Sequence, residues 1–441
     1  MQKILSDSLL RTCTAGVKVI SLHAGKTLFE YNSNKLLHPA SNIKLFTTAS
    51  ALHYLGKDFA VRTEIFIDNH KNLYIKSCGD PLLRTENFIS FAQELMQKGY
   101  NECNDIVADV SYFDDNYWGK GWMWDDEPDK TAMYISSLTI NSNSIAVFIS
   151  PSSLGMPPQV ALQPHTNFVL LLNQALTTQN SFASISKFEV TRKWKERENT
   201  ILIKGNLPIA AARDTFFLNV WNPVMYALTV FKEQYETAGG NVSGKLRIGK
   251  KEKSSLLISH HTPLDSLLAK ANKESDNLTA ENLLRIIAAE KFAQPAFADD
   301  GIFLEKKYLF SFGIDTAQII LADGSGASDY NLASADNIVT LLERATKNKQ
   351  TFTNFRNSLA IAGKDGTLKN RMNGTIAENI VSAKTGTKRG VSSLSGYIMN
   401  NNEEEVAFSI IINHFYGEGK ILRGIIDSFT VALVKQVKQT P

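Results

Sequence analysis

The chain has 441 residues, which is more than one ordinary hydrophobic core organises and therefore favours several domains or one domain with a large insertion. Hydrophobic residues make up 43% and charged residues 21%, so the composition excludes a disordered chain and an integral membrane protein. Lys and Arg number 47 against 44 Asp and Glu, a net charge of +3 that is too even to predict a nucleic-acid partner.

Strands and a helix are predicted at the N-terminal end. Residues 17–22 and 27–31 are β-rich and are joined at Gly25, which predicts a hairpin. Apolar residues then recur at helical spacing over 41–55, and Gly56 follows as a stop signal. This pattern predicts a largely buried helix.

The C-terminal end repeats this alternation. Residues 391–399 and 406–414 predict a second hairpin, with a further strand at 382–387 beside it. The last helix, over 422–437, has apolar residues at three- and four-residue spacing. Its polar face is not notably basic, so we expect it to pack on the sheet rather than lie on a membrane surface.

Similar elements at both ends predict one α/β domain that is interrupted by a long insertion. We expect the host domain to comprise residues 1–60 and 256–441, and the insertion to comprise 61–255, as one domain or two nested ones. Within the middle of the chain, 59–75 and 242–248 are β-rich, whereas 271–292 looks helical. The insertion is therefore expected to be mostly β.

Metal and disulfide chemistry has no support in the sequence. Cys13, Cys78 and Cys103 match no zinc-binding, redox or disulfide spacing, and the eight His residues show no metal-ligand pattern. No window approaches the ~20 apolar residues of a membrane-spanning helix, and the first residues lack a signal-peptide core. Taken literally, the chain is cytoplasmic, unless the given sequence begins after an export signal.

Ser41 and Lys44 form the first candidate catalytic pair. A serine and a lysine three residues apart at a helix start lie on one face, where the amine can activate the hydroxyl. The helix N-terminus would also favour a developing negative charge. The spacing alone is weak evidence, because Ser184 and Lys187 repeat it without comparable surroundings.

Two later motifs strengthen the interpretation of Ser41 and Lys44 as a catalytic pair. Ser275-Asp276-Asn277 precedes a helical stretch, where it could simply cap the helix. Lys384-Thr385-Gly386-Thr387 is expected on an edge strand, where glycine permits close approach of a ligand. In this order, the three motifs resemble those of the penicillin-recognising serine acyltransferases.

The long separation of Ser41 from Ser275 narrows the resemblance to D-alanyl-D-alanine carboxypeptidase/endopeptidases of the penicillin-binding-protein-4 type, the class C low-molecular-mass penicillin-binding proteins. Residues 79–83, 323–326 and 362–368 also match that pattern. The resemblance implies an α/β (α+β) fold of the β-lactamase/transpeptidase type, with an antiparallel sheet flanked by helices.

The resemblance also assigns roles to individual residues. Ser41 is implied as the nucleophile, Lys44 as its base and Ser275 as the proton relay to the leaving group. Asn277 is implied to hold the substrate amide or to orient Lys44. The substrate carboxylate is expected to bind Lys384 with the Thr385 and Thr387 hydroxyls, on the strand that Gly386 leaves open. The oxyanion hole is expected to consist of the backbone N–H groups of Ser41 and Thr387.

The aromatic segment 118–126 is a further candidate. One interpretation is an ordinary packed corner, since Trp is usually largely buried. In the resembling family, this stretch carries an acidic residue suited to the side-chain ammonium of a stem peptide, and Asp126 is the best match. The family's Tyr-rich run is replaced here by Asp129-Lys130-Thr131.

The expected function is that of a serine-type D-Ala-D-Ala carboxypeptidase and D,D-endopeptidase that acts on peptidoglycan stem peptides and is covalently inhibited by β-lactam antibiotics. It requires no metal or other cofactor and implies a periplasmic or otherwise extracytoplasmic location. One alternative is a β-lactamase or esterase on the same scaffold. The other is a non-catalytic protein that binds cell wall or senses β-lactams.

Overall fold

The computed structural model describes residues 7–179, 187–400 and 403–439. The second Ser-x-x-Lys spacing therefore lies outside the described residues, apart from Lys187. The chain divides into two compact units. Unit 1 comprises 1–60, 119–122 and 263–441, and unit 2 comprises 61–118 and 123–262.

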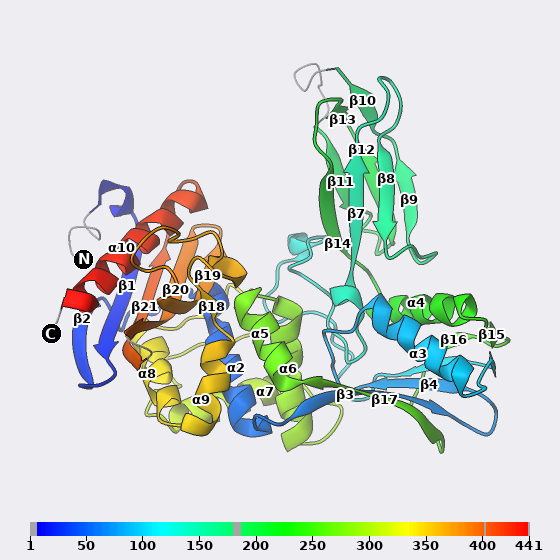
Figure 1. The fold of residues 1–441 in the computed structure, drawn as a ribbon, viewed down its shortest axis with the longest axis horizontal. Coiled ribbons are helices and arrows are strands. Elements are labelled where there is room, and N and C mark those ends of the chain that lie inside the picture. Colours follow the sequence, from blue (N-terminus) through cyan, green and yellow to red (C-terminus); the bar gives the residue numbers. More distant parts are fainter. Residues whose placement is uncertain (1–6, 180–186, 401–402, 440–441) are drawn as a thin grey trace. The chain divides into compact units, whose positions relative to one another are not determined.

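A six-stranded antiparallel sheet is the centre of unit 1. Its strand order is β18-β19-β20-β21-β1-β2, so β1 from the N-terminal end pairs with β21 from the C-terminal end (Figure 1). Both predicted hairpins are confirmed, although β20 and β21 extend further toward their connection than predicted. The strands are β1 (Thr14–Ser21), β2 (Lys26–Tyr31), β18 (Ala360–Ile361), β19 (Val381–Lys388), β20 (Val391–Asn400) and β21 (Glu403–Asn413).

Helices pack on both faces of this sheet because successive side chains of a strand point to opposite sides. On β20, Ile398 joins the core beneath α10 (Gly419–Gln439), which contributes Leu422 and Phe429 among others. The neighbouring Tyr397 points to the other face, where its hydroxyl donates to the Leu342 carbonyl of α8 (Ala335–Thr346) at 2.9 Å. The prediction that the terminal helix packs on the sheet is confirmed.

The remaining helices of unit 1 surround α2 (Ile43–Leu55), whose first ten residues are all buried. They are α5 (Leu264–Lys273), α6 (Asn277–Lys291), α7 (Ala298–Phe310) and α9 (Lys349–Asn357). The helix predicted over 271–292 is wrong in one respect, because it is broken between α5 and α6. Ser275 adopts a left-handed φ of 61° at the break, and the Asp276 carboxylate caps α6 by accepting the Thr279 backbone N–H at 2.8 Å.

Unit 2 combines a layered α/β portion with a part that consists of strands and loops. Its five-stranded sheet has the order β16-β6-β4-β3-β17 and is packed with α3 (Thr85–Gln97) and α4 (Pro223–Thr237). The Phe88 ring of α3 meets the Phe231 ring of α4 edge to face, with centroids 5.3 Å apart. These strands are β3 (Ala60–Ile67), β4 (Leu73–Ser77), β6 (Ile106–Asp109), β16 (Leu246–Ile248) and β17 (Ser255–Pro263), and β5 (Glu102–Cys103) pairs with β15 (Asn241–Val242).

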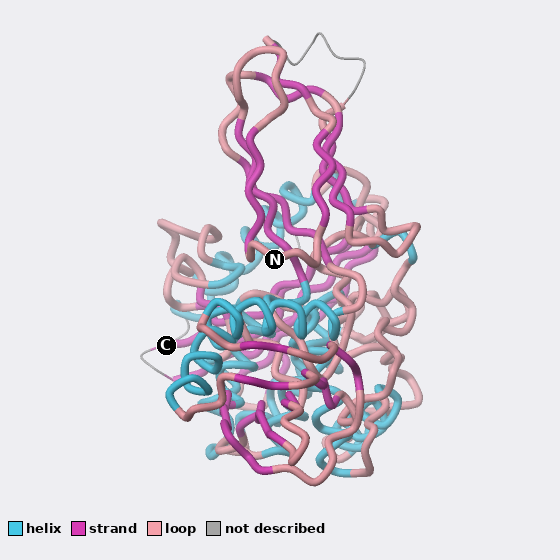
Figure 2. The backbone as a smooth tube through the Cα atoms, turned by 90° about the vertical axis from the view of Figure 1, so that its right-hand side faces the viewer, coloured by secondary structure: helices cyan, strands magenta, loops and turns pink. Residues whose placement is uncertain are grey.

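The strand-rich part of unit 2 has no helix among its described residues, as the magenta strands in Figure 2 show. It contains sheets of order β14-β7-β8 and β11-β12-β9 and the pair β10-β13. Its strands are β7 (Ser144–Ser150), β8 (Gln159–Gln163), β9 (Leu170–Asn173), β10 (Leu176–Thr178), β11 (Glu189–Arg192), β12 (Thr200–Lys204), β13 (Asn206–Pro208) and β14 (Asp214–Asn219).

Two further features concern the chain as a whole. Over the described ranges, no helix combines the length and the apolar character needed to cross a membrane. Cys78 and Cys103 are buried, and the three cysteines, all of them described, form no disulfide.

Candidate active site

The Ser41 hydroxyl lies beside the side chain of Lys44. Ser41 sits in a short 3-10 turn (Ala40–Asn42) that leads directly into α2, and Lys44 Nζ is 3.0 Å from Ser41 Oγ. Lys44 Nζ also donates to the Asn277 side-chain oxygen at 2.7 Å and to the Ser325 carbonyl at 2.6 Å. Both of these oxygens can only accept. In the neutral amine they use the two N–H groups, so the nitrogen lone pair is left for the Ser41 hydroxyl.

Burial lowers the pKa of Lys44, which makes its ammonium group easier to deprotonate. The side chain is completely buried, and this desolvation lowers the pKa of Lys44 to about 8. The negative charges of Asp323, Asp276 and Glu281 act in the opposite direction, in that order of strength. An appreciable fraction of Lys44 is therefore neutral near physiological pH.

The turn that carries Ser41 is held by close backbone contacts that two glycines permit. Ala40 has a left-handed φ of 48° and donates its N–H to His38 Nδ1 at 3.0 Å. A Cβ on Gly326, which itself has φ of 78°, would lie only 2.0 Å from the Ala40 carbonyl oxygen. A Cβ on Gly386 would lie 2.6 Å from the Pro39 oxygen. Larger residues would not fit at these positions, and Gly386 allows β19 to lie close to the turn that carries Ser41.

Ser275 and Lys384 form a second cluster of candidate site residues. Lys384 is fully buried on β19, and its Nζ donates to Ser275 Oγ at 2.8 Å and to the Thr385 carbonyl at 2.7 Å. Burial holds the pKa of Lys384 well below its usual range, and the charge of Lys44 lowers it further. The two lysines are thus electrostatically coupled, and an anion bound beside Lys384 would restore its positive charge.

The rest of the K-T-G motif lies along the same strand. The Thr385 hydroxyl is buried and donates to Thr367 Oγ1 at 2.8 Å. Gly386 pairs with Ser393 and Thr387 with Ser392 across to β20, and Thr387 is exposed. The structure therefore gathers Ser41, Lys44 and Asn277 in one cluster and brings Ser275 into contact with Lys384. Asn277 is the first residue of α6, and Ser275 lies in the break just before it.

A buried acidic group, which the sequence reasoning missed, holds the third contact of Lys44 in place. Glu281 on α6 accepts the backbone N–H groups of Gly324 and Ser325 at 2.9 and 3.0 Å. Asp323 accepts from the backbone of Gly326 at 2.7 Å. Together these carboxylates fix the loop whose Ser325 carbonyl binds Lys44.

Glu281 is itself in an unusual electrostatic environment. It is almost fully buried, and burial followed by the Asp323 charge raises the pKa of Glu281 to about 7. Arg285, one turn further along α6, forms an ion pair with it at 3.1 Å and opposes this rise. A signal was available in the sequence, since Glu281 is four residues after Asn277 and stands within a stretch of apolar residues.

Asp126 lies in unit 2, whereas the other predicted site residues lie in unit 1. Its carboxylate accepts the Met123 backbone N–H at 2.9 Å and closes the short turn Trp124–Asp126. The ammonium-binding role of Asp126 stays a prediction. Trp122, by contrast, belongs to unit 1 and donates its indole N–H to Asp323 at 2.8 Å.

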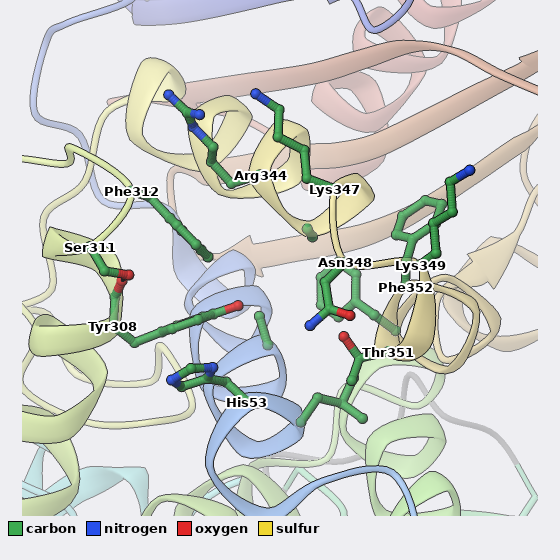
Figure 3. A pocket seen from close by; sticks show the side chains of 14 residues that line it. His53, Tyr308, Ser311, Phe312, Arg344, Lys347, Asn348, Lys349, Thr351 and Phe352 are labelled. Atoms are coloured by element: carbon green, nitrogen blue, oxygen red, sulfur yellow. Dashed lines mark hydrogen bonds between the residues drawn. The ribbon is translucent and has the colours of Figure 1, made fainter.

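A cavity of about 470 Å³ in unit 1 is separate from these groups. As Figure 3 shows, side chains of α2, α7, α8 and α9 surround it, among them His53, Tyr308 and Phe352, while the charged ends of Arg344 and Lys347 point away from its centre. None of the predicted site residues lines this cavity. Within the described residues, no cluster of three or more His, Cys, Asp or Glu side chains is arranged to hold a metal ion.

An antiparallel sheet with Ser41, Lys44, Ser275, Asn277 and Lys384 gathered beside its strand β19 defines a serine acyl-transfer enzyme of the penicillin-recognising class. The family model described as "D-Ala-D-Ala carboxypeptidase 3 (S13) family" matches residues 1–433, and the chain belongs to this family. The predicted fold class, enzyme class and D-Ala-D-Ala carboxypeptidase function are confirmed.

Relatives of known name cover nearly the whole chain. A D-alanyl-D-alanine carboxypeptidase of Actinomadura sp. (strain R39) is 33% identical over 98% of this chain and 83% of its own length. The D-alanyl-D-alanine carboxypeptidase DacB of Haemophilus influenzae is 28% identical over 93% of this chain and 88% of its own. The crystal structure of penicillin binding protein 4 (dacB) from H. influenzae matches with a TM-score of 0.86 and 27% identity, covering 98% of this chain and 99% of that one.

Proposed function

We propose that this enzyme hydrolyses the terminal D-Ala-D-Ala bond of peptidoglycan stem peptides through an acyl-enzyme on Ser41. The observation that carries the proposal is the environment of Lys44, whose Nζ donates to two pure acceptors and lies 3.0 Å from Ser41 Oγ, so that in the neutral amine the lone pair is left for the Ser41 hydroxyl. Neutral Lys44 takes the hydroxyl proton as Ser41 Oγ attacks the penultimate D-alanine carbonyl carbon. The backbone N–H groups of Ser41 and Thr387 stabilise the resulting oxyanion.

Ser275 and Lys384 serve the leaving D-alanine. Ser275 Oγ passes a proton to the departing nitrogen, and its contact with Lys384 supports such a transfer at 2.8 Å. Lys384 also binds the terminal carboxylate together with the Thr385 and Thr387 hydroxyls. Burial depresses the pKa of Lys384 in the free enzyme, so the carboxylate is the group that makes its ammonium form favourable. Water then hydrolyses the ester and restores Ser41.

The same site accounts for two further activities. A D,D-cross-link presents the same D-alanyl carbonyl, so the enzyme would also act as an endopeptidase. A β-lactam ring carries an acyl carbon and a carboxylate in a related arrangement, and the H. influenzae relative has been crystallised with a β-lactam. We therefore propose that penicillin acylates Ser41. Since peptidoglycan lies outside the cytoplasmic membrane, we propose a periplasmic or otherwise extracytoplasmic location.

The domain division belongs to this proposal. Residues 1–60 and 256–441 would form the penicillin-recognising domain, and 61–255 the inserted region. All predicted site residues except Asp126 lie in unit 1, which supports this division. Asp126, in the insertion, would bind the ammonium group of a diaminopimelate-type stem peptide.

Intact-mass measurement after incubation with benzylpenicillin tests the nucleophile. The expected result is one penicilloyl group per chain, carried by the peptide that contains Ser41. Ser41→Ala should abolish the adduct, whereas Ser184→Ala, from the second Ser-x-x-Lys sequence, should acquire it like the wild type. An adduct that persists in Ser41→Ala would overturn the assignment.

A further inference from the structure

Four of the five tryptophans lie in unit 2 and form two aromatic groups. In one group, Tyr134 packs against Trp118 and Trp221, with ring centroids 5.4 and 5.0 Å away. In the other, Trp124 packs against Trp194 at 5.1 Å between centroids. The first group is centred on the buried Tyr134, whereas the second group reaches the surface through Trp124.

We call the Trp124–Trp194 pair the indole platform; Trp194 is half-buried, and Trp124 is the exposed ring of the pair. Trp124 has 66% of its surface accessible, and the adjacent Met123 has 49%. Exposed indole costs hydrophobic free energy, and contiguous exposed aromatic surface commonly marks a binding site. We therefore expect the platform to bind a ligand that has a flat, apolar face.

A buried ion pair holds the two segments of the platform together. Arg192, two residues before Trp194, donates to the Glu127 carboxylate at 2.8 Å, and Glu127 stands three residues after Trp124. The two charged side chains are only 1% and 9% exposed, and Arg192 also donates to the Asn219 side-chain oxygen. The exposure of Trp124 thus belongs to a braced segment, and a ligand would find the surface already organised.

The charged groups around the platform favour a neutral ligand over a cationic one. The Lys195 ammonium lies 5.9 Å from the Trp124 ring centroid and 5.4 Å from that of Trp194. It already uses the cation-binding capacity of both rings, so a second cation such as a peptide ammonium would be repelled. The remaining aromatic face suits a neutral ring, and the exposed side chains of Asp125 and Lys195 can bond to hydroxyl or amide groups at its edge.

A pyranose ring has this chemistry. Its axial C–H groups form a weakly positive face that stacks on the negative face of an aromatic ring, while its hydroxyl and acetamido groups point outward. We propose that the indole platform binds the N-acetylated amino-sugar rings of the glycan strand that carries the stem peptide. This inference deepens the proposed function and rests on it, because it takes peptidoglycan as the substrate.

Binding of the N-acetylglucosamine tetramer to Ser41→Ala protein tests the proposal without any catalytic step. Titration calorimetry and the indole N–H resonances should report binding that weakens at least about tenfold in Trp124→Ala and in Trp194→Ala. Trp124→Phe, which keeps a smaller aromatic face, should bind with intermediate affinity. Tyr416→Ala, which removes a side chain that is 97% exposed in unit 1, should bind like its parent.

Circular dichroism and melting temperature establish that each variant is folded. The inference is overturned if the folded parent does not bind the tetramer, or if Trp124→Ala binds it as tightly as the parent does. Failure of the proposed function is distinguishable, because it would appear as absence of the Ser41 penicilloyl adduct while tetramer binding could still be present.

Discussion

The pH dependence of Ser41 acylation follows directly from the buried environment of Lys44. Desolvation lowers the pKa of Lys44 from 10.5 to about 8. At pH 7 about one tenth of the lysine is then neutral, against roughly 0.03% for an ordinary lysine. The change amounts to about 3 kcal/mol, or about 300-fold more free base at neutral pH.

Stopped-flow measurement with a fluorescent penicillin supplies the assay. At saturating ligand the bound carboxylate keeps Lys384 charged, so the acylation rate reports the ionisation of Lys44 in the complex. The rate should rise about fivefold between pH 7 and pH 8 and level off above about pH 9. Lys44→Arg, which retains the positive charge but cannot act as a base, should lose the reaction and its pH dependence.

Glu281 provides the control, because its pKa of about 7 falls in the same range. Its anion stabilises protonated Lys44, so Glu281→Gln should move the midpoint of the profile to lower pH. A flat profile, or a midpoint near the ordinary lysine value, would refute Lys44 as the base. Disappearance of the rising limb in Glu281→Gln would identify Glu281 as the titrating group instead.

Three other substitutions probe separate parts of the account. Asp126→Ala should weaken cleavage of amine-bearing stem peptides at least about tenfold while sparing penicillin acylation, and equal loss of both rates would refute the ammonium contact. Gly326→Ala should slow acylation about a hundredfold or more, because the new methyl would displace the Ala40 carbonyl next to Ser41, and a wild-type rate would contradict that geometry. Arg192→Met should reduce the free energy of unfolding by about 3–5 kcal/mol in urea titrations, since Glu127 would be left buried without its partner, and a change under about 1 kcal/mol would show that the pair is unimportant.

The outer elements of unit 1 were predictable because their patterns are local. Alternating β-rich runs give β1, β2, β20 and β21, and helical spacing gives α2 and α10. The interruption between α5 and α6 falls in six consecutive polar residues, 272–277, where the sequence offered Ser275-Asp276-Asn277 as a helix cap. The cap by Asp276 and the left-handed φ of Ser275, which no apolar pattern reports, separate the two helices.

The candidate site was predictable where short motifs place two groups together. Ser41 and Lys44 are brought into contact by a single helical turn, so their three-residue spacing was enough to predict the contact. The contact of Lys44 with the Ser325 carbonyl depends on a loop far away in the chain, and Glu281 orients that loop through backbone N–H groups. The position of Glu281 one turn after Asn277 was visible in the sequence, but its bonds to Gly324 and Ser325 leave no periodic trace, so its role could not be predicted.

Release of D-alanine from diacetyl-lysyl-D-alanyl-D-alanine is the most direct test of the central claim. The wild type should release D-alanine from this peptide and cleave a D,D-cross-linked muropeptide, whereas Ser41→Ala should do neither. Equal release by both proteins, or none by a wild type that is folded and acylated by penicillin, would contradict the assignment as a Ser41-dependent D-Ala-D-Ala carboxypeptidase.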